Sequence, residues 1–299
     1  MENAAHAELL DHEVYRTPLV VQPEFESRKT PGSYRRTYLG PGVLPDQFKV
    51  WRVQNSQVGN VVALSRGFLD SPDAEIIAVG FNHGKEYGAI GIGRHGNFLQ
   101  WGYGDTPSRM TEAGRRLFLN CIHYIRRFEG KAPLVRKRRS DRLQAVRIAP
   151  LGDRLREWAE RDSKVTPGIA MDILKRYVGD PNGLAQYFRD NLEWVYYDKG
   201  LRIDEELKSL GIESNRRIES LGRLIELLDD AQHAATAKTL LGRYTDRTFE
   251  TPPQWRQWFN ANKDRVFFSD VGGYKFFVVP EGYLIGPDRE TATGQSSSR

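Results

Sequence analysis

Cys121 is the one cysteine in 299 residues, and so it is the one thiol available as a nucleophile. A reactive thiol needs an exposed position whose surroundings favour the thiolate. Cys121 instead falls in the middle of a predicted helix, on the apolar side that Leu117 and Tyr124 share. The pattern predicts a buried, inert thiol. A single cysteine also excludes an internal disulfide and a zinc site built from cysteines.

The histidines do not form a metal-binding pattern, because no two of them are spaced four apart on a predicted helix. His12 lies between Asp11 and Glu13, and we interpret this cluster as solvated surface. The sequence has no phosphate-binding loop, nucleophile elbow or dinucleotide fingerprint. We therefore predict no catalytic residue, no metal and no cofactor. The histidines are His6, His12, His83, His95, His123 and His233.

Two groups of residues could bind a ligand. Arg94, His95, Trp101 and Asp105 cluster in and after a predicted hairpin, and an aromatic face ringed by polar groups suits a carbohydrate. The alternative is that His95 is simply an exposed turn residue.

The second group is the run Arg136, Lys137, Arg138 and Arg139. Such a run is either a solvated linker or a site for nucleic acid or another polyanion. It lacks the interleaved aromatic residues of a typical single-strand binder, so the sequence disfavours nucleic acid as a partner without excluding it.

The elements that position the first group, around Arg94 and His95, run from about residue 75 to residue 128. A buried strand is predicted for residues 75–79, and a hairpin follows with its turn at Gly96-Asn97. Gly91 and Gly93 indicate a close backbone approach on the first hairpin strand. Thr111 is a suitable N-cap for the helix that follows, and Gly130 lies just after its end. This order predicts a sheet with a helix packed on it.

These segments resemble a known family. Asp11–Tyr15 (DHEVY), Asp73–Ala78 (DAEIIA), the hairpin GIGRHGNFLQWG and Leu117–Asn120 (LFLN) look like the C-terminal part of a class I glutamine amidotransferase-like domain, of the ThuA-like branch. The resemblance covers roughly residues 10–130 and implies a partial flavodoxin-like α/β domain. The family's early parallel strands and nucleophile turn have no counterpart here. The family's histidine would lie near WGYGD, which has none, so amidotransferase chemistry is not expected.

The chain beyond residue 150 has a helical pattern. Helices are predicted over 151–161, from Thr166-Pro167 to Tyr177, and from Asp180-Pro181 to about Tyr197. Further helices are predicted over 203–210, 218–228 and 231–244, with another beginning at Thr251-Pro252. A β-hairpin with the strands Val266–Phe268 and Tyr274–Val279 closes the region. Its pattern resembles a C-terminal module of uncharacterised multidomain proteins of planctomycete bacteria.

The predicted organisation has five parts: a frayed N-terminus (1–11), a partial amidotransferase-like α/β domain (12–130), a basic linker (131–150), a mainly α-helical domain with a terminal hairpin (151–285) and a disordered tail (286–299).

Composition narrows the function only slightly. Apolar residues make up 39% and the net charge is +5, which permits an acidic partner without requiring one. With no signal peptide or membrane-spanning run, we expect a soluble, cytoplasmic bacterial protein by default. We predict a non-catalytic binding or scaffolding protein, with a protein partner or a second copy of itself. The alternatives are a ThuA-like sugar-handling protein with a pocket near His95, and a polyanion binder acting through the basic run.

Overall fold

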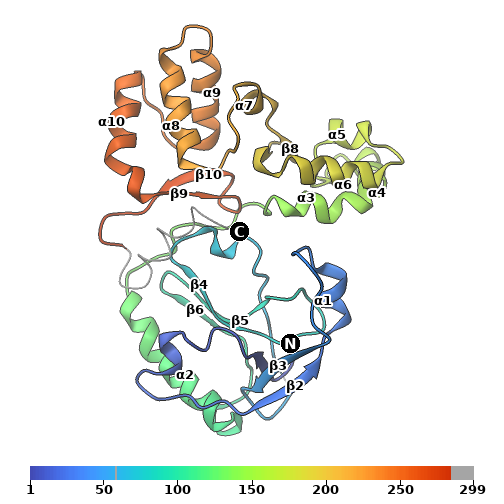
Figure 1. The fold of residues 1–299 in the computed structure, drawn as a ribbon, viewed down its shortest axis with the longest axis vertical. Helices are drawn as coiled ribbons and strands as arrows, with labels where there is room; N and C mark the ends of the chain where they lie inside the picture. Colours follow the sequence, from blue (N-terminus) through green and yellow to red (C-terminus); the bar gives the residue numbers. More distant parts are fainter. Residues whose placement is uncertain (58, 284–299) are drawn as a thin grey trace. The chain divides into compact units, whose positions relative to one another are not determined.

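The computed structural model describes residues 1–57 and 59–283 (Figure 1). The chain divides into two compact units, residues 1–134 and residues 135–299, and each has its own buried apolar cluster. The disordered tail predicted for residues 286–299 lies outside the described residues.

The first sheet of the N-terminal unit has the strand order β1-β3-β2. Strands β1 (Ala4–His6) and β2 (Phe25–Lys29) both pair antiparallel with β3 (Gln47–Arg52). Ala4, Ala5 and His6 are fully buried in this arrangement. The prediction of a frayed N-terminus over residues 1–11 is therefore wrong, because the two alanines are small enough to pack in the interior and His6 Nε2 is hydrogen-bonded there to the Tyr34 hydroxyl at 3.0 Å.

The second sheet has the order β4-β5-β6 and contains the predicted hairpin. Strand β5 (Ile90–His95) pairs antiparallel with β4 (Ala74–Val79) and with β6 (Phe98–Trp101). The hairpin turn contains Gly96 at φ +56°, a conformation that glycine adopts without strain. The predicted close approach is present too, because a Cβ on Gly91 would lie 3.0 Å from the Cα of Gly80.

Helix α2 (Glu112–Ile125) packs against this sheet, and α1 (Gly32–Thr37) lies beside the first sheet (Figure 1). The predicted N-cap is confirmed, since the Thr111 Oγ1 accepts a hydrogen bond of 3.0 Å from the Gly114 amide. The rings of Trp101 and Phe118 meet edge to face across the interface, with centroids 5.0 Å apart. Short 3₁₀ turns complete the unit: η1 (Glu13–Tyr15), η2 (Phe68–Asp70), η3 (Pro107–Arg109) and η4 (Arg126–Phe128).

A mixed architecture of helices and sheets is therefore confirmed. The flavodoxin-like arrangement is not confirmed, because that fold is a mostly parallel sheet and the strand pairs described in this unit are antiparallel.

The second unit begins with a stretch that is only partly a linker. Helix α3 (Leu143–Ile148) and the turn η5 (Ala149–Leu151) occupy the end of the predicted linker 131–150. Ala145 and Ala149 are fully buried in the core of the unit. The linker prediction is corrected here, because small apolar residues spaced four apart give this basic stretch a buried face.

Two groups of helices make up most of this unit (Figure 1). The first group follows α3 and contains α4 (Gly152–Arg161), α5 (Met171–Arg176) and α6 (Pro181–Asp190). The second group contains α8 (Ile218–Glu226), α9 (Ala234–Tyr244) and α10 (Pro252–Asn262). The elements between and beside them are η6 (Leu192–Trp194), α7 (Glu205–Ser209), η7 (Leu227–Asp229) and η8 (Lys263–Arg265).

Two predicted helices are shorter than expected. Thr166-Pro167 does not open a helix, because Gly168 has φ +81° and Ile169 forms a parallel bridge with Leu201. The helix from Pro181 ends at Asp190, and the chain then forms β7 (Val195–Tyr197), which pairs antiparallel with β8 (Leu201–Ile203).

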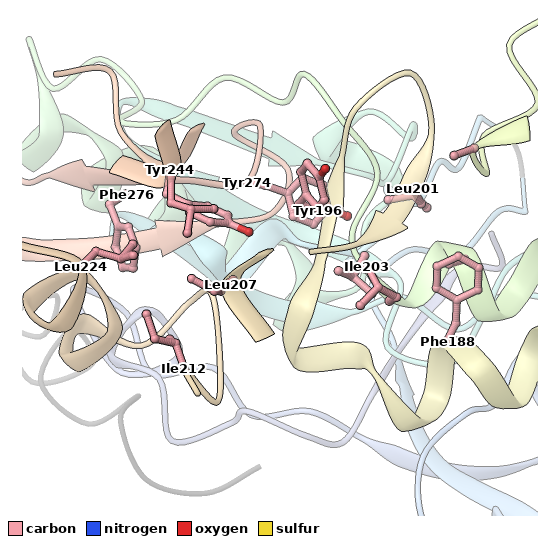
Figure 2. Packing of buried hydrophobic residues seen from close by; sticks show 14 of the residues in the cluster. Phe188, Tyr196, Leu201, Ile203, Leu207, Ile212, Leu224, Tyr244, Tyr274 and Phe276 are labelled. Carbon is pink, nitrogen blue, oxygen red and sulfur yellow. The ribbon is translucent and has the colours of Figure 1, made fainter. Parts of the chain in front are cut away.

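The terminal hairpin is confirmed, with β9 (Val266–Ser269) antiparallel to β10 (Lys275–Val278). It adds Phe276 to a single apolar cluster that joins both helix groups. Figure 2 shows this cluster extending from Phe276 and Leu224, past Tyr244 and Ile203, to Phe188 on α6. The core thus packs helix α3 and the terminal hairpin into one unit.

Candidate anion-binding groove

The carbohydrate pocket predicted around His95 is not formed by its four residues. Arg94 and His95 are neighbours on β5, so their side chains point to opposite faces of the sheet. Arg94 is 1% exposed; its Nε donates to Glu75 Oε1 at 2.5 Å, and its guanidinium lies 3.6 Å from the Phe128 ring centroid. His95 Nε2 lies 3.5 Å from Asp73 Oδ1 on the other face.

The other two residues of that prediction are also engaged elsewhere. Trp101 packs on Phe118 of α2, and Asp105 accepts a 3.3 Å hydrogen bond from the Ser56 amide. The structure therefore uses Arg94 and Trp101 to join α2 to its sheet and uses Asp105 to fix a loop.

Glu75 is the centre of a polar network that the sequence did not reveal. Besides Arg94, it accepts hydrogen bonds from the Tyr124 hydroxyl at 2.6 Å and pairs with His12 Nε2 at 3.2 Å. Burial alone would raise the pKa of Glu75, but His12, Arg94 and Tyr124 outweigh it and lower the pKa to about 2. His12 is thus a partner of a buried acid and not part of a solvated cluster.

Cys121 is buried on α2, as predicted. Burial, followed by the nearby Glu75, raises the pKa of its thiol to about 12. A thiol in this state is not a nucleophile at neutral pH.

The basic run differs from these residues, because its side chains lie on the surface. Arg136, Lys137, Arg138 and Arg139 are all exposed. Their backbone is held in place nonetheless, because the Arg138 and Arg139 amides both donate to the Val271 carbonyl, at 2.7 and 3.1 Å. The side chains are therefore displayed from a fixed backbone and not from a loose linker.

The residues that follow the run anchor it to the terminal hairpin. The Tyr274 hydroxyl donates to the Ser140 carbonyl at 2.9 Å. Arg142 is buried and donates through Nε to Asp270 Oδ2 at 2.8 Å and through Nη2 to Asn215 Oδ1 at 3.1 Å. The buried ion pair and its hydrogen bonds set the position of the run relative to β9 and β10.

An open groove of about 390 Å³ lies beside this anchored segment. Lys137, Arg138 and Arg139 line it, and none of the ten residues that line it is Asp or Glu. The neutral side chains of Ser140, Gln144 and Thr166 add hydrogen-bonding groups. Among the described residues, the first ion pairs after the basic run are those of Asp141 with Arg147 and of Arg142 with Asp270. No acidic side chain of the described residues lines the groove or pairs with Lys137, Arg138 or Arg139, so its lining carries a concentrated positive charge.

No family model, curated protein or solved structure matches the chain. Within residues 1–57 and 59–283, no group of three or more His, Cys, Asp or Glu side chains is placed to hold a metal ion. No helix in these same residues is both long enough and apolar enough to cross a lipid bilayer.

The arrangement of the groove suits binding of an anion. It offers guanidinium and ammonium donors to a negatively charged ligand, with hydroxyl and amide groups beside them. The charge run could be found in the sequence. The contribution of Tyr197 and Leu201 could not, because the β7–β8 pairing brings these residues to the groove. Thr166 lies there because the segment that follows it forms a bridge with Leu201.

Proposed function

We propose that this chain is an anion-binding protein whose helical unit holds a polyanionic ligand in the groove beside Arg136–Arg139. The observation that supports this most directly is a segment of four exposed cations, without acidic partners among the described residues, whose backbone is fixed by hydrogen bonds of the Arg138 and Arg139 amides to the Val271 carbonyl. A backbone already held in position loses less conformational entropy when the segment binds, which favours affinity.

The sugar-handling and scaffolding alternatives remain predictions from the sequence. The first depended on a shared pocket for Arg94, His95, Trp101 and Asp105, and these four have other partners. The second needs a partner surface, and no contact of the described residues favours one.

A binding titration tests the proposal. The purified chain is titrated into fluorescently labelled polyphosphate and labelled single-stranded DNA at several salt concentrations. Each cation that contacts a phosphate contributes about 0.7–0.9 to the slope of log affinity against log salt. The variant R138Q/R139Q should therefore reduce that slope by about 1.4–1.8 and weaken binding to both probes.

The control is K175Q/R176Q, which removes the same charge from exposed positions on α5 in the same unit. It should leave the salt slope unchanged. Equal weakening by both double variants, or no binding by the unmodified chain, would overturn the proposal.

A further inference from the structure

Arg139 differs from its neighbours in the basic run. Its guanidinium carbon lies 4.4 Å from the ring centroid of Tyr197, so the two groups are in cation–π contact. Its Nη1 also donates to the Arg138 carbonyl at 3.2 Å, and its amide donates to Val271. The planar end of an exposed side chain is thus held at a defined place in the groove.

Tyr197 supports the Arg139 guanidinium from a fixed position. It lies at the end of β7 and packs, partly buried, against the apolar cluster of the unit. The guanidinium therefore lies over a fixed ring, while Arg139 itself stays exposed and lines the groove. Arginine planes and aromatic rings are the surfaces on which unpaired bases stack.

The remaining walls combine two kinds of surface. Lys137 and Arg138 supply charge, whereas Ile148 and Leu201 supply apolar area. Polyphosphate or a sulfated polysaccharide would use the charge alone. A nucleotide would use both, because it joins a charged phosphate to a planar base whose two faces are apolar.

The size of the groove agrees with this ligand class. Its volume of about 390 Å³ falls within the usual range for small-molecule sites, about 300–1,000 Å³.

We infer that the groove takes a nucleotide unit, its phosphate bound by Lys137 and Arg138 and its base stacked on the Arg139 plane. The inference rests on the proposed anion-binding function and specifies its ligand. A free nucleotide and one unit of a single-stranded nucleic acid share this chemistry.

Matched ligands separate the contribution of the base from that of the charge. Calorimetry on the full chain compares AMP with ribose 5-phosphate, and a short oligoadenylate with an abasic strand of equal length. We expect the ligand that carries bases to bind about tenfold more tightly in at least one pair, the usual scale of one stacking contact. A preference within the AMP pair indicates a free nucleotide, and a preference within the strand pair alone indicates a nucleic acid.

The variant R139K keeps the charge but removes the planar group. It should abolish the preference for bases while leaving affinity for the abasic strand within about twofold, on the scale of an exposed charge retained in place. R138K is the matched control and should keep the preference.

Two results would overturn the inference: equal affinity within both ligand pairs, or an undiminished preference in R139K. In either case binding of polyphosphate would leave the anion-binding function standing. Failure of the chain to bind any of these ligands, polyphosphate included, would overturn both.

Discussion

At the scale of single residues, several ionisable side chains of the N-terminal unit, Glu75 above all, form contacts within the unit. Glu75 binds three partners that come from three separate segments: His12, Arg94 and Tyr124. One carboxylate thereby joins the chain near residue 12, the strand β5 and the helix α2. Because its pKa is about 2, against an ordinary 4.5, Glu75 is ionised in the folded protein well into the acid range.

This shift predicts how stability depends on pH. The pKa of Glu75 is lower in the folded chain than in the unfolded chain, so the ionised group stabilises the fold fully above about pH 4.5, and that contribution is lost as the pH falls toward 2. The contribution is about 3 kcal/mol. In Glu75→Gln, the free energy of unfolding measured with urea should be lower at neutral pH and should fall less steeply between about pH 5 and pH 2.

Glu112→Gln is the control, since Glu112 is exposed and pairs with Arg116 on the surface. It should keep the steep acid loss of the unmodified protein. A steep loss retained in Glu75→Gln would contradict the assignment.

The sequence could single out Arg94 and His95 as unusual but could not assign their roles. Their partners Glu75 and Asp73 lie about 20 residues earlier, and the antiparallel register of β4 and β5 brings the pairs together. A shift of that register by one residue would reverse which side chain faces α2. The pocket hypothesis grouped Arg94 with His95 because residue types are visible in the sequence, whereas the face of the sheet to which each side chain points is not.

At the scale of elements, α2 and α9 offer two helical glycines in opposite surroundings. A Cβ on Gly114 would lie 1.9 Å from the backbone oxygen of Val53. A Cβ on Gly242 would meet no atom within 4 Å. The first glycine is required for the start of α2 to approach the segment after β3, whereas the second is not required by any contact.

The two positions should respond oppositely to alanine. Gly242→Ala should stabilise the protein by about 0.5–1 kcal/mol, because alanine loses less backbone entropy in a helix. Gly114→Ala should destabilise it by about 1–3 kcal/mol, the usual cost of overpacking. Thermal or urea unfolding of both variants measures the difference, and stabilisation by Gly114→Ala would show that the contact yields easily.

Prediction of the elements followed local signals. The N-cap Thr111 and the turn at Gly96 are local, and both were predicted. Strand β7 was not, because Val195 continues the apolar spacing of α6, and only the pairing with β8 makes this stretch a strand. The groove depends on that same pairing, so its basic side could be predicted and its Tyr197 side could not.

At the scale of the molecule, the second unit is closed on itself by the pair Arg142 and Asp270. Their side chains are 6% and 9% exposed, and the Arg142 amide also donates to Asp270 at 2.9 Å. The pair thus joins the beginning of the unit to its terminal hairpin.

Removing the acid should be costly. Asp270→Asn leaves the buried guanidinium of Arg142 without its counter-charge, for which we expect a loss of about 3–5 kcal/mol in the free energy of unfolding. Arg223→Gln is the control, since it breaks an exposed pair with Glu226 on α8 and should cost less than about 1 kcal/mol. Similar costs for the two variants, measured by urea unfolding, would contradict a buried role for the pair.

The distance along the chain between these two residues also has a consequence for biosynthesis. Asp270 follows Arg142 by 128 residues, and a ribosome adds only about 5–20 residues per second. For several seconds, therefore, each nascent chain carries Arg142 before its counter-charge exists. The helical unit completes its core only when the terminal hairpin emerges. A truncated mRNA that ends before the codon for Asp270 yields a product in which Arg142 has no counter-charge and cannot be buried. Cellular proteases can recognise and remove such an incompletely folded product.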